Sequence, residues 1–340
     1  MFGLGWLRAL TDARGLLEHA HHGVPRLGEG YTTDDNARAL LYLSLLPEGA
    51  RDEGLVRTYL AFLLHMQKED GRFRNGLTLD GRFEDEGEAE DPTGRAVLAL
   101  AAAQRLPPPY AGPAREALIR AIHALEGFTS LRGRAYALLG LLALPKEPFL
   151  EAAEALGEGL LRAFREAEPA WPYPGPLTYA NHRPVEALYA YGLAFRRQEA
   201  VALARRALAF LKEHYFTPGE EGLFFDPVGN RFMARGRDKP LFDQQPIEAK
   251  CALLAHLRFG ERVLAEVAFL WFHGRNRLRA PLVDAFGPMD GLTPHGPNQN
   301  RGAEALLAYL LAWQALVQGV FPQVDEGVAL GRVFALGGRP

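Results

Sequence analysis

The sequence predicts an all-α protein with an (α/α)6 barrel, a toroid built from six helical hairpins. A polar cluster recurs six times, each time directly before an apolar, alanine-rich run, at intervals of roughly 50 residues. Helical runs of two kinds also alternate, one amphipathic and one apolar on nearly all sides. An inner ring of buried helices inside an outer ring of amphipathic helices explains both observations. The clusters begin at Thr33, Glu90, Leu131, Asn181, Asp243 and Asn298.

The outer helices are predicted from a helical period with one solvated side. In residues 199–214, Val201, Ala204, Leu208 and Leu211 share one face, and charged side chains occupy the rest. The same pattern predicts outer helices over residues 4–20, 52–67, 114–125, 148–164 and 261–272.

The inner helices are predicted from runs that have no polar face, which must be covered on every side. Three prolines fit the first helical position, where a missing N–H costs nothing. Asp91 is a candidate N-cap, and Thr33 or Asp34 could cap the first inner helix. The runs cover residues 38–46, 96–106, 135–144, 247–257 and 303–316, and the prolines are Pro92, Pro184 and Pro246.

The repeat predicts one domain over residues 1–318, followed by a tail or strap over residues 319–340. The connections before the inner helices are long, and long structured loops in a compact domain are usually functional. They fall on the face where the polar clusters begin, so this face is the expected site. Residues 222–225 and 231–233 predict a small β-hairpin there. The long connections are residues 68–90, 168–181, 216–242 and 274–298.

Composition excludes several classes of function. A net charge of −3 gives no electrostatic case for binding nucleic acid or an anionic membrane. Cys251 is the single cysteine, and the histidine spacing fits no zinc site, so we expect no metal and no cofactor. No run is long enough to span a bilayer and none has the pattern of a signal peptide, so we expect a cytoplasmic protein. Few Asn, Gln, Met and Cys residues are compatible with a thermophilic source.

The most specific stretch is the first polar cluster, which places Asp34 and Asp35 together at a helix start. The helix dipole favours acidic side chains there, and capping plus an ion pair with Arg38 would explain one of them. Two carboxylates exceed what capping requires, and the neighbouring Tyr31 suits a sugar site. We therefore predict that Asp35 is catalytic and that Asp34 contacts the substrate.

The second cluster adds Asp91, a candidate both for capping and for ligand contact. Arg95 follows one turn inside an otherwise apolar run, where a buried guanidinium needs a partner. Asp34, Asp35 or Asp91 could supply it.

The fifth and sixth clusters are rich in amides, whose donors and acceptors match sugar hydroxyls. Asp243 precedes two amides in the fifth cluster, which makes it a third catalytic candidate. Glu186, Glu248 and Glu304 occupy equivalent positions in their helices. They could be catalytic, but their repetition favours a role in bonding neighbouring repeats. The amides are Gln244, Gln245, Asn298 and Asn300.

Four of these stretches together resemble a family of six-hairpin, glycosidase-like proteins, often found beside or fused to glycosyltransferases and mannoside phosphorylases. The resemblance implies an (α/α)6 barrel and a carbohydrate ligand, and it suggests a glycosyltransferase as a candidate partner. The chain departs from the family pattern at Arg301 and Ala305, which puts contacts at those two positions in doubt. The matching stretches are residues 30–38, 90–95, 244–249 and 298–304.

The leading hypothesis is therefore hydrolysis of an oligosaccharide, with mannose as a candidate component, by a two-carboxylate and inverting mechanism. Asp35, Asp91 and Asp243 are the catalytic candidates. The expected stacking residues are Tyr31, Trp171, Tyr173 and Phe286, and further expected ligand contacts are Asp34, Arg95, His182, Gln244, Gln245, Asp290, Asn298 and Asn300.

Two other functions stay open. A sugar 2-epimerase or isomerase on the same scaffold would use histidines as acid and base, so His182 and His295 would have to face the site. A non-catalytic glycan-binding partner of a glycosyltransferase would bind sugar without turnover.

Overall fold

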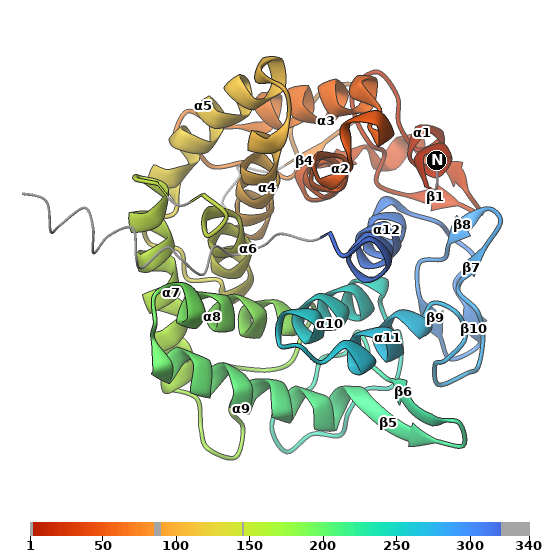
Figure 1. The fold of residues 1–340 in the computed structure, drawn as a ribbon. Coiled ribbons are helices and arrows are strands. Elements are labelled where there is room, and N and C mark those ends of the chain that lie inside the picture. Colours follow the sequence, from red (N-terminus) through yellow and green to blue (C-terminus); the bar gives the residue numbers. More distant parts are fainter. Residues whose placement is uncertain (1–2, 85–89, 145, 321–340) are drawn as a thin grey trace, which may run out of the picture.

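The computed structural model describes residues 3–84, 90–144 and 146–320, and it has the predicted ring of inner helices (Figure 1). Each inner helix packs against the next, and the last packs against the first, so the ring is closed. The inner helices are α2 (Thr33–Leu45), α4 (Glu90–Ala102), α6 (Leu131–Leu141), α8 (His182–Ala194), α10 (Pro246–Arg258) and α12 (Ala303–Gln318).

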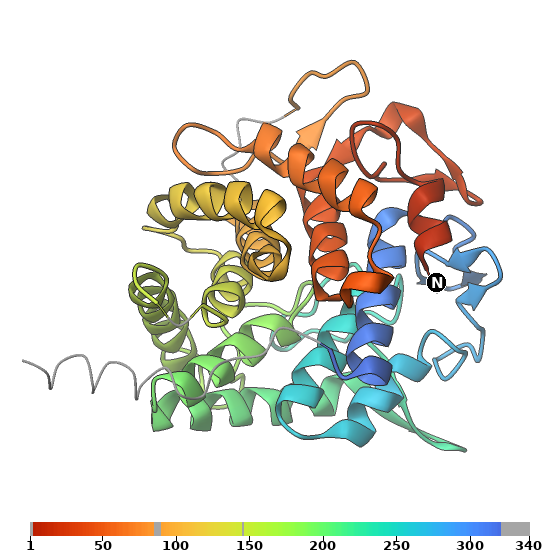
Figure 2. The same cartoon turned by 45° about the horizontal axis from the view of Figure 1, so that its top comes forward.

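The outer helices surround this ring, one beside each inner helix (Figures 1 and 2). Their apolar faces cover the inner helices, which are buried on nearly all sides as their sequences predict. The (α/α)6 prediction is therefore confirmed. The outer helices are α1 (Leu4–Ala9), α3 (Glu53–Met66), α5 (Pro108–Ala124), α7 (Phe149–Arg165), α9 (Gln198–Tyr215) and α11 (Arg262–Leu270).

The connections between the helices contain short antiparallel strand pairs and single turns of 3₁₀ helix. The strand pairs are β1 (Ala20–His21) with β2 (Val24–Pro25), β3 (Tyr31–Thr32) with β4 (Gly76–Leu77), β5 (Phe216–Gly219) with β6 (Gly222–Phe225), β7 (Val283–Asp284) with β8 (Gly287–Pro288), and β9 (Leu292–Thr293) with β10 (Gly296–Pro297). The 3₁₀ turns are η1 (Leu27–Glu29), η2 (Glu48–Ala50) and η3 (Ala103–Arg105).

The first outer helix is shorter than predicted, because α1 ends at Ala9 and not near residue 20. The chain then turns back, and the backbone N–H of Leu17 donates to the carbonyl of Leu10 at 2.9 Å. The side chain of Asn36, buried in α2, accepts the backbone N–H of Leu16 at 2.9 Å. This tertiary contact holds the chain at Leu16 against α2, and residues 10–32 form turns, short strands and a 3₁₀ turn where the pattern predicted a helix.

A small hairpin is present in the loops of the site face, but its predicted pairing is wrong. Strand β6 pairs with β5, which precedes it, across a short turn, and the register joins Gly219 to Gly222. Met233, expected on the partner strand, instead forms a bridge with Leu177. Strand β6 pairs with β5 and not with residues 231–233 because the β5–β6 pairing closes the shorter loop.

Some helix starts differ from those that the sequence predicted. Thr32 caps α2, and its hydroxyl accepts the N–H of Asp35 at 3.2 Å, so the predicted caps Thr33 and Asp34 lie inside the helix. Asp91 likewise lies inside α4, which begins at Glu90. Among the three prolines, Pro246 occupies the first position of its helix, whereas Pro92 and Pro184 come two residues after the first.

Helix α12 ends at Gln318, where the predicted domain ends, and Gly319 follows in the left-handed conformation with φ 67°. The rest of the predicted tail, from residue 321 on, lies outside the described residues. Within the described ranges, no helix combines the length and the apolar character that crossing a membrane requires.

The close approach of α4 and α6 gives a test of the fold. A Cβ on Gly94 would overlap the carbonyl oxygen of Gly133 in the facing helix, and neither backbone can yield easily. We expect Gly94→Ala to lower the free energy of unfolding by about 1–3 kcal/mol, as overpacking does. Urea unfolding measures the change.

Gly5 of α1 is the matched control, because a Cβ there would meet nothing within 4 Å. Gly5→Ala should raise the free energy of unfolding by about 0.4–1 kcal/mol, since it restricts only the unfolded chain. Equal effects of the two substitutions would contradict the described packing of α4 on α6.

Candidate active site

A cavity of about 260 Å³ opens where α2, α10 and α12 begin, on the face where the long loops gather. Its wall is polar and carries five carboxyl groups. The lining residues are Glu18, His19, Thr32, Asp34, Asp35, Arg38, Asn75, Gln245, Asp290, Gly302, Glu304 and Ala305.

Asp35 forms the buried floor of the cavity and is only 3% exposed. Its Oδ1 accepts from Arg38 Nη1 at 2.5 Å, and its Oδ2 accepts from the Thr32 hydroxyl at 3.0 Å. The other side of the Arg38 guanidinium donates to Glu304 at 3.1 Å. Burial raises the pKa of Asp35, although the charge of Arg38 opposes the rise. The first and last inner helices thus meet through one arginine.

Asp34 also lines the cavity, and its partner is Arg95, as the sequence allowed. Arg95 lies in the neighbouring helix α4, and its guanidinium carbon is 4.7 Å from the centre of the Tyr136 ring. The backbone N–H of Asp34 donates to the side-chain oxygen of Asn75 at 3.3 Å. These contacts fix the direction of the Asp34 carboxylate.

Glu18 is held in the cavity by its own backbone. Its N–H donates to the carbonyl of Gly30 at 3.0 Å, and its carbonyl accepts the N–H of Ala303 at 2.9 Å. Burial and the negative charge of Asp35 raise the pKa of Glu18 to about 7, and nearby His19 opposes the rise. The His19 Nε2 lies 3.5 Å from the Glu18 carboxylate. The cavity therefore contains a carboxyl group that keeps its proton up to about neutral pH, far above the range of an ordinary glutamate.

Asp290 reaches the cavity from the connection between the hairpins β7–β8 and β9–β10. Its carboxylate accepts the N–H of Gly302 at 2.5 Å, and its own N–H donates to the carbonyl of Asn300 at 2.9 Å. Burial raises the pKa of Asp290, and the charges of Glu304 and Asp35 add to the rise. The side chain of Asn298 accepts the N–H of Asn300 at 3.1 Å, so these two amides lie in the loop that supports Asp290.

Four of the residues predicted from the sequence line the cavity together: Asp34, Asp35, Gln245 and Asp290. Asp91 and Asp243 are not in its wall. The carboxylate of Asp91 accepts from Arg132 at 2.8 Å, and also from Ser130 and Tyr179. Burial acts to raise the pKa of Asp91, but these contacts outweigh it and lower the pKa. Asp243 is exposed.

The expected stacking residues are spread over different places. Tyr31 is fully buried, and its hydroxyl donates to Asp12 at 2.6 Å. Trp171 and Tyr173 border a separate cavity of about 520 Å³. Phe286 is 76% exposed at the turn between β7 and β8.

Two further expected contacts are internal to the fold. Gln244 is buried, accepts from the Trp271 indole at 2.9 Å and donates to Asp226 at 2.8 Å. His182 is buried with its ring edge-on to Tyr215, and burial lowers its pKa well below the ordinary value. His295 is exposed between β9 and β10.

Sequence reasoning missed Glu18, His19 and Asn75. Glu18 lies in a stretch whose periodicity predicted an outer helix, and Asn75 lies in a long loop with no cluster around it. The available signal was the polar group of His19, His21 and His22 near the first loop. In the described residues, no three His, Cys, Asp or Glu side chains are arranged to hold a metal ion.

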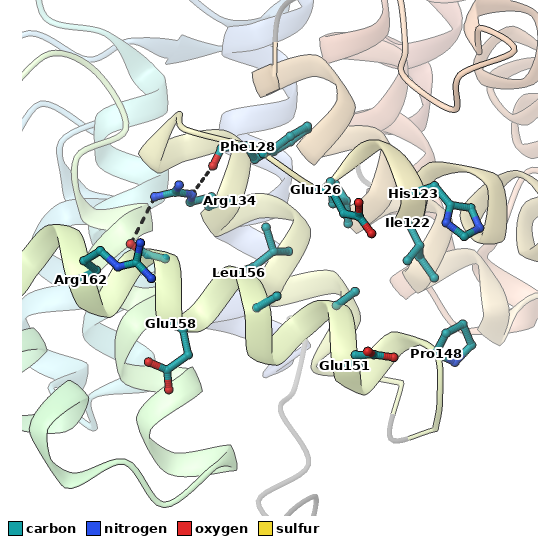
Figure 3. A pocket seen from close by; sticks show the side chains of 15 residues that line it. Ile122, His123, Glu126, Phe128, Arg134, Pro148, Glu151, Leu156, Glu158 and Arg162 are labelled. Carbon is teal, nitrogen blue, oxygen red and sulfur yellow. Dashed lines mark hydrogen bonds between the residues drawn. The ribbon is translucent and has the colours of Figure 1, made fainter.

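A larger cavity, about 450 Å³, lies between α5 and α7 on the outside of the ring (Figure 3). Arg134 crosses it and donates to the carbonyls of Phe128 at 2.6 Å and Gly159 at 3.2 Å. Its acidic side chains, Glu126, Glu151 and Glu158, stand apart from one another (Figure 3). It therefore lacks the converging carboxyl groups of the cavity of about 260 Å³ at the starts of α2, α10 and α12, which we call the cavity above α2.

No family model matches the chain, and no curated protein sequence is significantly similar to it. Solved structures do match it over nearly their full length. A D-mannose isomerase superposes with a TM-score of 0.68 at 11% identity, covering 93% of this chain and 95% of that one. A cellobiose 2-epimerase from Bacillus thermoamylovorans B4167 gives a TM-score of 0.67 at 9% identity, covering 91% and 95%.

A GH76 α-mannanase from Bacteroides thetaiotaomicron also matches, with a TM-score of 0.61 at 11% identity over 98% of this chain and 95% of that one. The chain has the fold of these structures. At such low identity the likeness shows the fold alone.

The electrostatics of the cavity can be tested on Glu18. In Asp35→Asn the repelling charge of residue 35 is lost, so the pKa of Glu18 should fall from about 7. It should stay above the ordinary value for glutamate, because burial is the larger cause of the rise. Carboxyl ¹³C NMR titration, with Glu18→Gln to assign the resonance, measures this pKa.

Asp238→Asn, at an exposed position, is the matched control and should leave the titration of Glu18 unchanged. A Glu18 resonance that titrates at the ordinary glutamate pKa in the wild type would contradict the described cavity.

Proposed function

We propose that the chain is a carbohydrate-active enzyme, and that its reaction is hydrolysis of a glycosidic bond in the cavity above α2. The observation that carries the proposal is the carboxyl group of Glu18, with a pKa of about 7, in one small cavity with Asp290 and Asp35. Glycoside hydrolysis needs one carboxyl group that keeps its proton at working pH and a second that acts on water.

In this proposal Glu18 protonates the leaving oxygen, and Asp290 acts as the base that takes a proton from the attacking water. The N–H of Gly302 donates to the Asp290 carboxylate and opposes the rise in its pKa that burial causes. Asp35, bound by Arg38 and Thr32, holds the floor and raises the pKa of Glu18. The reaction is inverting in this scheme, by analogy with other toroids of this class.

The side chains of Asn75 and Gln245 supply the amide groups that would bind sugar hydroxyls. Mannose-containing oligosaccharides are the first substrates to test, because the GH76 neighbour is described as an α-mannanase. Asp91 and Asp243 take no part in the proposed bond cleavage, since they lie outside the cavity wall.

A second candidate is epimerisation or isomerisation of a free sugar, and His19 is the observation that favours it. A histidine beside a protonated glutamate, 3.5 Å apart at the cavity, is an arrangement suited to moving a proton to and from carbon. His19 would take the role that the sequence suggested for His182 and His295. The isomerase and the epimerase among the structural neighbours support this candidate.

One experiment separates the candidates. The protein is incubated in D₂O with mannosides, glucosides, free mannose and cellobiose, and products are followed by NMR. New reducing ends indicate hydrolysis, whereas deuterium at carbon 2 of an intact sugar indicates epimerisation or isomerisation. Saturable binding without either product would favour the non-catalytic glycan-binding partner of a glycosyltransferase.

The hydrolysis proposal predicts that Glu18→Gln and Asp290→Asn each lower turnover by roughly 10²–10⁴-fold, the usual contribution of acid–base catalysis. Wild-type turnover should fall as pH rises through about 7, because Glu18 then loses the proton that it must donate. Turnover on the best substrate of the panel, measured between pH 5 and pH 9, gives both results.

Asp238→Asn, exposed and outside the cavity, is the control and should keep wild-type turnover. If His19→Ala abolishes turnover while Asp290→Asn retains it, hydrolysis is excluded in favour of epimerisation. If both cavity variants stay fully active, the site lies elsewhere.

A further inference from the structure

The axis of the barrel contains a group of buried cations that the proposed reaction does not use. We call Arg38, Arg95, Arg183 and Lys250 the axis cluster. They come from four inner helices, and each is at most 6% exposed. The Tyr136 ring lies between two of them, 4.7 Å from the guanidinium carbon of Arg95 and 5.6 Å from that of Arg183.

Each arginine of the cluster binds at least one carboxylate through its terminal nitrogens. Arg38 binds Asp35 and Glu304, Arg95 binds Asp34, and Arg183 binds Glu186 at 2.5 Å. The Nε–H of each of these arginines is buried, and none has an acceptor in the part of the chain that the structure describes. Three charged donors are thus left without a partner.

Lys250, which is buried in α10, completes the cluster. Burial, together with the charges of Arg183, Arg38 and Arg95, lowers the pKa of Lys250 to about 8, while neighbouring Cys251 opposes this shift. Helix α10 lies across the ring from α4 (Figure 1), so an interaction of Lys250 with Arg95 passes through the interior of the barrel.

Lys250 is 2% exposed and has no hydrogen bond or ion pair with any residue in the ranges 3–84, 90–144 and 146–320. The acidic residue nearest to it on α10, Glu248, is directed elsewhere, because its carboxylate accepts the backbone N–H of Ala180. A buried ammonium group without a counter-charge is strongly unfavourable. The cluster therefore contains one ammonium group without a counter-charge of its own and an excess of hydrogen-bond donors.

We propose that the axis cluster binds a small inorganic anion of the size of chloride, held by Lys250 Nζ and by free Nε–H groups of the arginines. All the unpaired groups in the cluster are donors, which suits an anion that only accepts. The side chains are packed between helices, which favours a small, weakly hydrated anion over phosphate or a carboxylated sugar. The bound anion would fix Arg38 and Arg95, and through them Asp35 and Asp34 in the cavity.

The test uses bromide, which replaces chloride and scatters X-rays anomalously. Crystals of the wild-type protein grown in sodium bromide should show an anomalous peak on the barrel axis within contact distance of Lys250 Nζ. In solution, the wild-type Tm should rise with bromide concentration at constant ionic strength, with gluconate as the replacing anion, because only the folded chain has the site.

Lys250→Met keeps the length of the side chain and removes its charge, and it should lose both the axial peak and the specific rise in Tm. Lys212→Met, at a partly exposed lysine of α9, is the matched control and should keep both. If Lys250→Met does not fold, the presence or absence of the axial bromide peak in wild-type crystals still tests the proposal. No axial peak in the wild type, or a peak that persists in Lys250→Met, overturns the proposal.

Discussion

The buried guanidinium of Arg38 is the contact on which the arrangement of the site depends. It joins Asp35 of the first inner helix to Glu304 of the last, and so closes the polar end of the ring. A buried ion pair adds little net stability, but removal of one partner is strongly unfavourable because it leaves a charge unpaired. The starts of α2 and α12 must therefore lie side by side, and the loops before them bring Glu18 and Asp290 to the same place.

Once these groups share one cavity, their chemistry follows from burial and mutual repulsion. Low exposure disfavours ionised carboxylates, and the negative charge of Asp35 contributes to the raised pKa values of both Glu18 and Asp290. Asp91, on the same face, shows the opposite case. It has an arginine and two hydroxyl partners of its own, so its pKa falls and its carboxylate is occupied. Whether a carboxyl group on this face keeps its proton thus depends on how many charged and hydroxyl partners it has within the protein.

The sequence contains enough to predict the ring, because period and burial are local properties of each helix. It also predicts that the polar clusters gather on one face. It does not reveal which clusters share a cavity, since that depends on contacts such as Arg132 with Asp91. It hides Glu18 altogether, because the helical pattern of residues 4–20 is overridden by Asn36, whose side chain binds the backbone of Leu16. Tertiary contacts between distant segments therefore determine which residues line the cavity.

The central claim is that the cavity above α2 is where a sugar binds and reacts. A crystal structure of Glu18→Gln with a mannose-containing oligosaccharide tests it most directly, because the variant should bind without turning over. The account predicts a sugar ring within hydrogen-bond distance of Asp290 and Gln245, with its scissile oxygen next to residue 18. A sugar bound instead between α5 and α7 (Figure 3), or beside Trp171, with the cavity above α2 free of sugar, would contradict it.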